Sequence, residues 1–371
     1  MTIKKHKKHP PINRPNRGEY GRNEIGLLGA PCDIILKWIE ATTKSMSDFK
    51  LAYVDAEHHP SEAGLIKRLT DKISHHYISY TEHLNKYDQQ LLLDKEDLVF
   101  VNCNHFNANR QIVFCTDRKK DSLQRKLEKL TDVRLVVLEE GIDQPFDFLL
   151  PYLNDATSIL RIDQIGSASK LIKSLILQPE VKGLILAGGR SMRMGEDKAR
   201  INYHGMSQVD FVKQTLDKVG IESFVSCRRE QGDQYSCPTI YDAFNDMGPF
   251  GAILSAFKNY PNVAWMVVAC DMPFLKPIHF QELLNNRDIS KTATCYHNPD
   301  TGWPDPLITL WEPKAYSRLL EFMSLGYNCP RKVLINSHVQ LIKSEDKTFL
   351  TNANSPIEKN EAMNTLKKTK H

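Results

Sequence analysis

Two glycines and three cationic residues follow an apolar run in the second half of the chain. The run is Val181–Leu186, and it continues into Ala187, Gly188, Gly189 and the basic residues Arg190, Arg193 and Lys198. Glycine has no Cβ, so its backbone turns tightly and can bring N–H groups close to an anion. Positive charge beside those N–H groups favours a polyphosphate as the ligand. The alternative is a tight turn between a strand and a helix, with basic residues that lie in solvent.

The spacing of these residues excludes two common nucleotide-binding motifs. A Walker A loop requires GxxxxGK[ST], and a dinucleotide-binding dehydrogenase requires GxGxxG after its first strand. Neither spacing occurs after Leu186. The segment therefore predicts a phosphate-binding loop of another kind, at the carboxyl end of a buried strand, where open α/β sheets bind their ligands.

Asp271 follows a second apolar run, Trp265–Ala269, where a strand is expected to end. An unpaired carboxylate is costly to bury, whereas a bound Mg²⁺ ion would pair with it. Proteins commonly hold Mg²⁺ through one or two carboxylates together with the phosphates of a substrate. We therefore expect Asp271 to bind Mg²⁺, with capping of the next helix as the alternative.

Glycine and polar residues elsewhere in the same half are further candidates. Gly248 and Gly251 lie in one loop, which could let a base or a ribose approach the backbone or could form an ordinary turn into a helix. Asp242 could hydrogen-bond the base or the ribose, or could cap a helix. Asn352 and Asn354 stand close together, as asparagines also do in plain turns.

Short apolar runs alternate with helical patterns along most of the chain, which predicts an α/β protein built from parallel β-α-β units. Runs without polar alternation are typical of strands that are buried on both faces of a sheet. The expected strands are Ile25–Leu28, Leu51–Asp55, Asp97–Asn102, Gln111–Cys115, Arg134–Leu138, Val181–Leu186, Ser223–Cys227, Val263–Ala269, Thr292–Tyr296 and Leu307–Leu310. Helices are expected at Asp33–Thr43, Ser61–His75 and Ser167–Leu177, and the stretch Asn154–Pro179 is expected to connect two domains.

The pattern divides the chain into two α/β domains between two polar ends. Residues 1–22 carry seven Lys or Arg and one Glu without an apolar pattern, so we expect a disordered basic tail. A smaller N-terminal α/β domain is expected at 23–170, a C-terminal domain at 178–362 and a polar tail at 363–371. The candidate residues above all lie in the C-terminal domain.

Composition limits the class of protein. The 371 residues are 41% hydrophobic and 25% charged, which is ordinary for a globular protein and excludes a wholly disordered chain. A net charge of +4 does not argue for nucleic-acid binding, no run of about 18 apolar residues could span a membrane, and the polar, basic first residues do not form a secretory signal. The eight cysteines include no CxxC pair, so we expect a reduced, cytoplasmic protein without a disulfide framework or a zinc site.

Five segments of the second half resemble, in the same order, the motifs of molybdenum cofactor guanylyltransferases. Residues 186–198 match the opening LAGGxxxRMGxDK, and an acidic residue followed by GPLAG resembles 242–252. The strand end CDMPF, an (E/H)P loop and the closing NxNTPED resemble residues 270–274, 303–307 and 352–356. The resemblance implies a Rossmann-like nucleotidyltransferase fold for 178–362, with a mostly parallel sheet between helices.

The resemblance also implies a reaction. The terminal phosphate of the molybdopterin cofactor attacks the α-phosphate of GTP in the presence of Mg²⁺, and pyrophosphate leaves. A phosphate monoester is already ionised near neutral pH, so no general base is required. In this chain, the backbone of Leu186–Gly189 would cradle the phosphates, Arg193, Lys198 and, as a further candidate, Arg190 would offset their charge, and Asp271 would hold Mg²⁺. The resemblance assigns further residues to the nucleotide (Ser226, Asp242, Gly248, Gly251) and to the second substrate (Asp305, Asn352, Asn354).

Two positions bear on the choice of base. Ser226 departs from the family, which often has Asn near the base. Related cytidylyltransferases favour LAAG where residues 186–189 read LAGG, and this difference favours GTP over CTP. Two alternatives stay open: another nucleotidyltransferase that uses CTP or acts on a sugar phosphate, and a catalytically silent paralogue that binds a nucleotide or the cofactor.

The N-terminal half begins with a strand, a loop and a helix start at 24–34, where a P-loop would lie, but no Gly-Lys-Ser/Thr follows. Together with Asp55 after the next strand and the strand Asp97–Asn102, this order resembles a degenerate form of the P-loop adaptor protein of molybdopterin-guanine dinucleotide biosynthesis. The resemblance implies a docking domain that has lost nucleotide hydrolysis. The partners expected for it are the cofactor donor, molybdoenzyme apo-proteins, other pathway proteins or a second copy of the chain, with no nucleic acid and no membrane.

Overall fold

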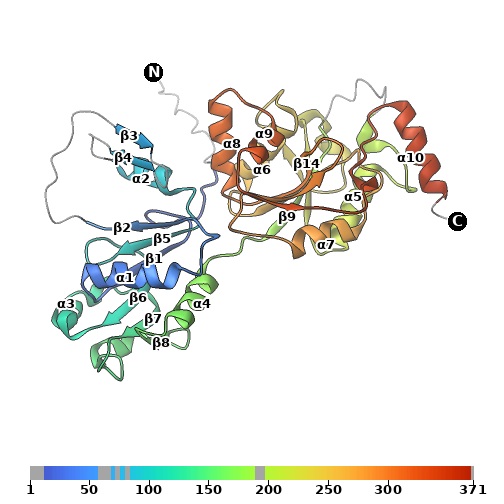
Figure 1. Cartoon of the computed structure of the whole chain (residues 1–371). Helices are drawn as coiled ribbons and strands as arrows, with labels where there is room; N and C mark the ends of the chain where they lie inside the picture. Colours follow the sequence, from blue (N-terminus) through green and yellow to red (C-terminus); the bar gives the residue numbers. More distant parts are fainter. Residues whose placement is uncertain (1–11, 57–67, 72–75, 80–83, 189–196, 369–371) are drawn as a thin grey trace, which may run out of the picture. The chain divides into compact units, whose positions relative to one another are not determined.

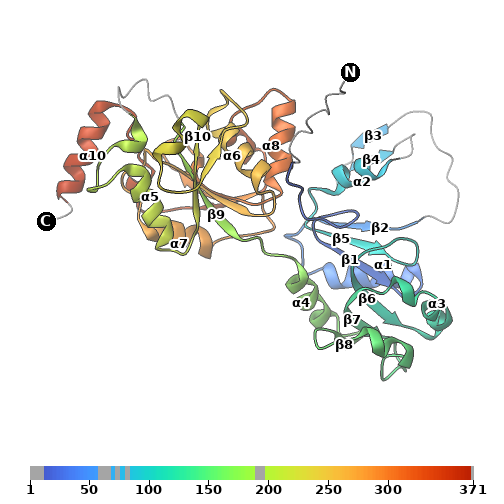
Figure 2. The same ribbon diagram turned by 180° about the vertical axis from the view of Figure 1, so that it is seen from behind.

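The computed structural model describes residues 12–56, 68–71, 76–79, 84–188 and 197–368. The chain divides into two compact units, which we describe separately (Figures 1 and 2). The N-terminal unit is Asn16–Leu177, and the C-terminal unit combines the residues up to Pro15 with those from Gln178 onward. Each unit has a central sheet with helices, so the α/β class expected from the sequence is confirmed.

The N-terminal unit contains a parallel sheet of six strands. Strand β1 lies between β5 and β6, although β2 follows it in the sequence. The chain therefore leaves β1 in one direction and later returns to its other side, and this reversal is the point where parallel α/β sheets bind ligands. In spatial order the strands are β2 Leu51–Val54, β5 Leu98–Asn102, β1 Glu24–Leu28, β6 Arg110–Cys115, β7 Asp132–Leu138 and β8 Ser158–Arg161.

Helices cover both faces of this sheet. Helices α1 (Cys32–Thr43) and α4 (Ile165–Leu175) pack together, and Trp38 of α1 meets Phe114 of β6 edge to face, with ring centres 5.2 Å apart. On the other face, Leu123 of α3 (Lys120–Gln124) joins a core with residues of β5 and β6. Helix α2 (Lys86–Leu93) precedes β5, and a two-stranded hairpin is formed by β3 Arg68–Asp71 and β4 His76–Ser79.

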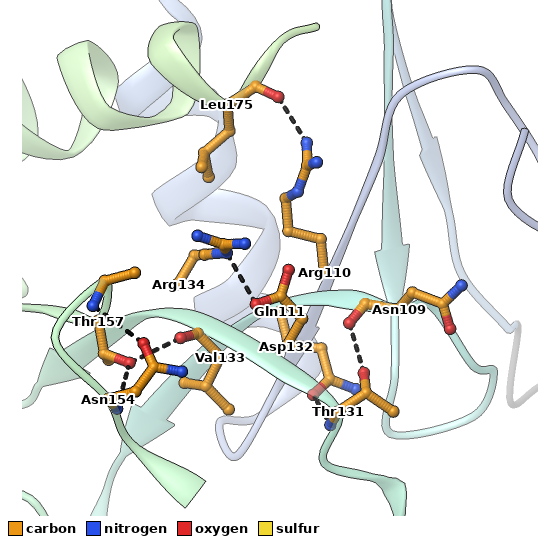
Figure 3. Close-up of polar contacts among 11 residues, drawn as sticks. Asn109, Arg110, Gln111, Thr131, Asp132, Val133, Arg134, Asn154, Thr157 and Leu175 are labelled. Carbon is orange, nitrogen blue, oxygen red and sulfur yellow. Dashed lines mark hydrogen bonds and ion pairs between the residues drawn. The ribbon is translucent and has the colours of Figure 1, made fainter. Parts of the chain in front are cut away.

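The amino ends of β6, β7 and β8 are fixed by side chains that hydrogen-bond to the backbone (Figure 3). The Gln111 side chain donates to Lys129 O at 2.7 Å and accepts from Thr131 N at 2.9 Å. Thr157 Oγ1 donates to Val133 O at 2.8 Å, and Arg110 reaches Leu175 O at the end of α4. These bonds tie backbone groups together at the amino ends of the strands, opposite their carboxyl ends.

The C-terminal unit contains a mixed sheet of seven strands. Strand β9 pairs in parallel with β10 on one side and with β12 on the other. The carboxyl ends of β9 and β12 therefore meet at a second reversal of strand order. In spatial order the strands are β11 Thr239–Tyr241, β10 Ser223–Cys227, β9 Val181–Leu186, β12 Ala264–Ala269, β14 Trp303–Trp311, β13 Ala293–Asn298 and β15 Val339–Ile342. Only β14 is antiparallel to its neighbours among these paired strands.

Two apolar cores lie on opposite faces of this sheet. Ile185 joins the core beneath α5 (Gln208–Asp217) and α7 (Pro277–Asn285). Its neighbour Leu184 joins the core beneath α6 (Gly248–Asn259), α8 (Ala315–Ser324) and α9 (Pro330–Ile335). Successive residues of a strand point to opposite faces, so the apolar residues 184–186 at the end of β9 supply both cores. The last helix is α10 (Pro356–Lys368), and the short 3-10 helices are Asp117–Lys119, Leu127–Lys129, Asp147–Tyr152, Lys198–Arg200, Arg229–Gln234 and Thr348–Leu350.

Several expectations are corrected by the structure. Residues 68–71 form β3 rather than part of a helix over Ser61–His75, and the rest of that prediction lies largely outside the described residues. The expected connection Asn154–Pro179 contains the unexpected strand β8, whereas α4 confirms the helix expected at Ser167–Leu177. Residues 363–368 of the expected polar tail form the end of helix α10. In the expected basic tail, Arg17 pairs with Asp94 and Glu19 with Lys86 at 2.6 Å, so these residues make defined contacts, while residues 1–11 lie outside the described part.

Candidate active site

The turn after β9 brings backbone close to two neighbouring segments. Ala187 N donates to Ser226 O at 3.0 Å, which continues the pairing with β10 for one residue beyond the strand. A Cβ added to Gly188 would lie 3.1 Å from Asp242 Oδ2 and 3.4 Å from Cys227 Cα. The lack of a side chain therefore keeps the entrance to this turn open. Gly189, Arg190 and Arg193, which the sequence proposes for the phosphates, lie outside the described residues.

Lys198 and Asp271 meet at the carboxyl ends of β9 and β12. Lys198 Nζ lies 3.1 Å from Asp271 Oδ2 and donates to Asn354 Oδ1 at 2.6 Å. Asp197 starts the short helix of Lys198 by accepting Ala199 N at 3.0 Å. The side chains of Lys198 and Asp271 are 20% and 14% exposed, so the pair is mostly buried but reachable from solvent. Three residues that the sequence proposes separately are thus brought into one cluster.

Two oxygen atoms are buried without a hydrogen-bond partner in the described part of the chain: Asp271 Oδ1, which belongs to this cluster, and Asn352 Oδ1, in the loop that leads to Asn354. The loop between the two asparagines is anchored here, because Ala353 N donates to Asp271 O at 2.9 Å. A buried oxygen without a partner costs free energy. Carboxylate and amide oxygens are ligands that Mg²⁺ prefers, so these residues fit a divalent cation.

A cavity of about 1080 Å³ lies beside the turn, in the same unit. Gly188, Asp242 and Gly248, which the sequence assigns to the nucleotide, line it, and that assignment stays a prediction. Ser226 is buried and donates to Asp242 Oδ1 at 2.6 Å, so it positions the carboxylate. Burial raises the pKa of Asp242, while the bond from Ser226 and the charge of Arg228 act in the opposite direction. The volume is large enough for a nucleoside or a drug-sized ligand.

The cavity also has basic residues that the sequence analysis does not single out. Arg228, Arg229 and Lys258 line it, and the Arg229 guanidinium lies 5.6 Å from the centre of the Tyr241 ring. Arg228 and Arg229 directly follow β10, as the glycine turn follows β9. Their position directly after an expected strand could have identified them, because residues at the carboxyl ends of adjacent parallel strands commonly share a site.

Gly248 and Gly251 differ in what they do. Gly248 has φ +55°, a left-handed conformation that favours glycine, and it lines the cavity. Gly251 is buried in α6, and a Cβ there would lie 2.3 Å from Phe244 O. Its geometry gives it a packing role, because it lets the helix approach the preceding loop.

Asp305 has a separate environment within β14. Its side chain is buried, Oδ2 accepts from Asn298 Nδ2 at 3.0 Å, and Oδ1 accepts from Leu307 N at 2.9 Å. Both carboxylate oxygens are therefore engaged in holding the turn between β13 and β14. The assignment of Asp305 to a second substrate stays a prediction.

Comparison of the sequence with known proteins shows a family for the half of the chain that holds this site. Residues 183–341 match the model of the MobA-like NTP transferase domain. A "Molybdenum cofactor biosynthesis bifunctional protein" of Synechocystis sp. is 34% identical over 187 residues, which cover 50% of this chain and 54% of that protein. A "Probable molybdenum cofactor guanylyltransferase" of Natronomonas pharaonis is 32% identical over 143 residues, which cover 36% of this chain and 69% of that protein.

Among solved structures, the "Molybdopterin-guanine dinucleotide biosynthesis protein A" of Archaeoglobus fulgidus matches with a TM-score of 0.44 and 23% identity, covering 50% of this chain and 99% of that one. The residues of the C-terminal half matched by the family model include β12, Lys198 and Asp271, whereas Asn354 follows them in the chain. Through this half, the chain belongs to the family of molybdenum cofactor guanylyltransferases, which carry a MobA-like NTP transferase domain.

Proposed function

We propose that the C-terminal unit transfers GMP from GTP to the terminal phosphate of molybdenum cofactor, with Mg²⁺ bound and with release of pyrophosphate. The observation that carries this proposal is the contact of Lys198 with Asp271 and Asn354 at the reversal of strand order between β9 and β12. The printed names of the relatives agree with it, since the protein of Natronomonas pharaonis is called a probable molybdenum cofactor guanylyltransferase and that of Synechocystis sp. a molybdenum cofactor biosynthesis bifunctional protein.

Lys198 supplies a fixed positive charge in this reaction. Two anionic reactants repel each other, so the protein must position them and offset the charge that develops on the leaving group. The Asp271 and Asn354 oxygens hold the ammonium group at the carboxyl ends of the strands. The partial exposure of the Lys198 side chain lets its ammonium group contact a phosphate oxygen.

Asp271 and Asn352 would hold the Mg²⁺ ion. Each has a buried oxygen without a hydrogen-bond partner among the described residues. When bound there, the ion would offset negative charge on the triphosphate. The chain itself needs no general base, because the attacking phosphate is already ionised.

Asp242 gives the cavity a preference for guanine. Guanine presents N–H donors on two adjacent positions of its base-pairing edge, and a carboxylate has two oxygens that accept. Asp242 Oδ1 is held by Ser226, and Oδ2 lies beside the space that the absent side chain of Gly188 leaves. Arg228 and Lys258 add positive charge for a phosphate or ribose at the same cavity.

The test is turnover by the full-length protein. Molybdopterin cofactor is supplied with GTP or CTP and Mg²⁺, and both pyrophosphate and the dinucleotide product are measured. We expect product with GTP, and a loss of at least about tenfold in kcat/KM for Lys198→Ala and for Asp271→Asn, because each change removes a charge-assisted contact. The matched controls are Lys213→Ala and Asp217→Asn, which remove the two halves of an ion pair on α5.

Each other outcome revises the proposal in a defined way. A product with CTP alone keeps the chemistry and replaces the base. Turnover of a sugar phosphate in place of the cofactor moves the chain to another class of nucleotidyltransferase. An absence of turnover with any nucleotide, from a protein that still binds GTP, overturns the catalytic proposal in favour of a silent paralogue.

A further inference from the structure

A second cluster of chemically active side chains lies in the N-terminal unit. It consists of Cys32, Asp55 and His105. The cysteine sulfur, one carboxylate oxygen and one imidazole nitrogen all lie within 4.8 Å of one another. The three residues come from separate places: the first residue of α1, the residue after β2, and the loop after β5. Strands β2, β5 and β1 are neighbours in that order (Figure 1), so their carboxyl ends bring the three together.

A fully buried asparagine hydrogen-bonds to two residues of this cluster. Asn102 Nδ2 donates to Asp55 Oδ1 at 2.8 Å and to Cys32 Sγ at 3.2 Å. Asn102 Oδ1 accepts the backbone N–H of Asn104 at 3.1 Å, which fixes the orientation of the amide. Tyr53 hydroxyl donates to Asp55 Oδ2 at 2.8 Å. Such outer hydrogen bonds orient the ligands in metal sites.

The loops that carry Cys32 and His105 are tied to each other. Asn104 Nδ2 donates to Ala30 O at 2.9 Å, just before the cysteine. His105 Nε2 lies 3.5 Å from Cys32 Sγ. The ligand atoms are therefore close before any ion is present, which lowers the cost of assembling a site on binding.

The donor set selects the class of ion. A thiolate, an imidazole and a carboxylate suit Zn²⁺ and similar transition metals, whereas Mg²⁺ and Ca²⁺ prefer oxygen ligands alone. With a deprotonated cysteine and a neutral histidine, the three groups carry two negative charges, which balance a divalent cation. Asp55 and His105 are exposed and Cys32 is half-buried, so an ion can enter from solvent.

We propose that Cys32, Asp55 and His105 bind a Zn²⁺-class transition-metal ion, with a fourth position that no ligand among the described residues fills and that water or an anionic ligand can take. Three protein ligands with an open position are typical of reactive rather than purely structural zinc sites. This site is independent of the proposed guanylyltransferase reaction and uses none of its residues. It also revises the expectation of no zinc site, which rested on the spacing of cysteines, since a single cysteine suffices here.

The experiment is a titration of the metal-free, reduced full-length protein with Co²⁺, followed by displacement with Zn²⁺. We expect one equivalent to produce a thiolate-to-cobalt charge-transfer band and the visible absorption of a four-coordinate ion. Cys32→Ser should abolish the charge-transfer band, and His105→Ala and Asp55→Asn should each weaken binding at least tenfold. The control Cys329→Ser removes an exposed cysteine of the other unit and should leave the band unchanged.

A further variant separates a metal site from a chance contact of polar groups. Tyr53→Phe removes the hydrogen bond to Asp55 but keeps every ligand. We expect about tenfold weaker Co²⁺ binding with the charge-transfer band retained. The proposal is overturned if wild type shows no thiolate-to-cobalt band, or if the band survives in Cys32→Ser while circular dichroism shows both proteins folded.

Discussion

Lys198 and Asp271 stand 73 positions apart, yet their side chains form one contact. The sequence identifies each of them, because each follows an apolar run that could be a strand. It does not predict their pairing with Asn354, since that depends on which strands are neighbours and on where the last loop of the chain lies. The sequence does not identify Arg228 and Arg229 as site residues either, because their position at the cavity follows from the parallel pairing of β10 with β9.

Asp242 provides a test of pH dependence at the scale of one residue. Burial raises its pKa in the folded protein, so the charged carboxylate opposes folding above the folded pKa. This destabilisation becomes smaller as the pH falls toward the pKa of Asp in the unfolded chain, about 3.9. Asp242→Asn keeps an oxygen for Ser226 and removes the charge. We expect denaturant unfolding of the C-terminal unit to show a more stable variant, with a larger gain at pH 8 than at pH 4.5.

The same variant should bind GTP more weakly, because it replaces one of the two acceptors offered to the base by a donor. Asp217→Asn is the control, since its carboxylate lies on the surface of α5 and pairs with Lys213. A variant that gains stability and keeps its affinity for GTP would remove Asp242 from the nucleotide site.

Gly251 provides a second test, of packing. A Cβ at this position would lie 2.3 Å from a backbone oxygen, which cannot rotate away. We expect Gly251→Ala to destabilise the C-terminal unit by about 1–3 kcal/mol in denaturant unfolding. The control is Gly166→Ala in α4, where nothing lies within 4 Å of the added carbon. That change should stabilise its own unit by about 0.5–1 kcal/mol, and equal effects at the two positions would contradict the role given to Gly251.

At the scale of elements, the central strands are predictable and several edge strands are not. Every residue of β12 and of β5 is buried, and apart from Asn102 at the end of β5 each strand is a continuous apolar segment in the sequence. The strands that the sequence misses in the two main sheets are β8, β11 and β15, and each lies at an edge. Their side chains are partly exposed, so no apolar run marks them. Pairing with a neighbour, rather than composition, makes them strands.

The end of α7 is joined to the end of β14 by a buried ion pair. Arg287 Nε and Nη2 donate to the two oxygens of Glu312 at 2.7 and 2.9 Å, and the side chains are 14% and 2% exposed. Burial raises the pKa of Glu312, while Arg287 acts in the opposite direction. Arg287→Ala leaves the carboxylate buried without this partner, so we expect a loss of about 3–5 kcal/mol in the free energy of unfolding.

The control for Arg287→Ala is Lys213→Ala, which breaks the surface pair with Asp217 and should cost less than about 0.5 kcal/mol. Loss of Arg287 raises the pKa of Glu312 further, so the variant is relieved of its unpaired charge as the pH falls. The loss of unfolding free energy in Arg287→Ala should therefore be smaller at pH 5 than at pH 8. Chemical denaturation at both pH values measures it. A deficit that is small, or equal at the two pH values, would show that water reaches Glu312 and replaces the guanidinium.

At the scale of the whole molecule, each of the two units has its own sheet, core and cluster of polar side chains at the carboxyl ends of its strands. No helix in the described part of the chain is long and apolar enough to cross a membrane. The sequence predicts two α/β domains from the alternation of elements. It does not predict that residues up to Pro15 group with the C-terminal unit, because Asn13 contacts Asn259, far away in the sequence.

Two ligands should therefore stabilise two different unfolding transitions of the full chain. In calorimetry, GTP with Mg²⁺ should raise the transition of the C-terminal unit, and Zn²⁺ that of the N-terminal unit. A ligand at a hundredfold excess over its Kd adds about 2.7 kcal/mol to the unit that binds it. Cys32→Ser should remove the second shift and Asp271→Asn should reduce the first. If one ligand shifts both transitions equally, the units do not unfold independently.

Strand β12 pairs with β9, although β10 and β11 are translated between them. This order has a consequence for folding during translation. A chain that has emerged from the ribosome as far as Gly188 has the glycine turn but neither Asp271 nor Asn354, so it offers a nucleotide only part of a site. The N-terminal unit, by contrast, has all of its residues once Leu177 is out, and domains generally fold as they emerge. On the proposed function, GTP should therefore protect only a nearly finished chain, and a product truncated before Asn352 should remain as sensitive to proteases with GTP as without it.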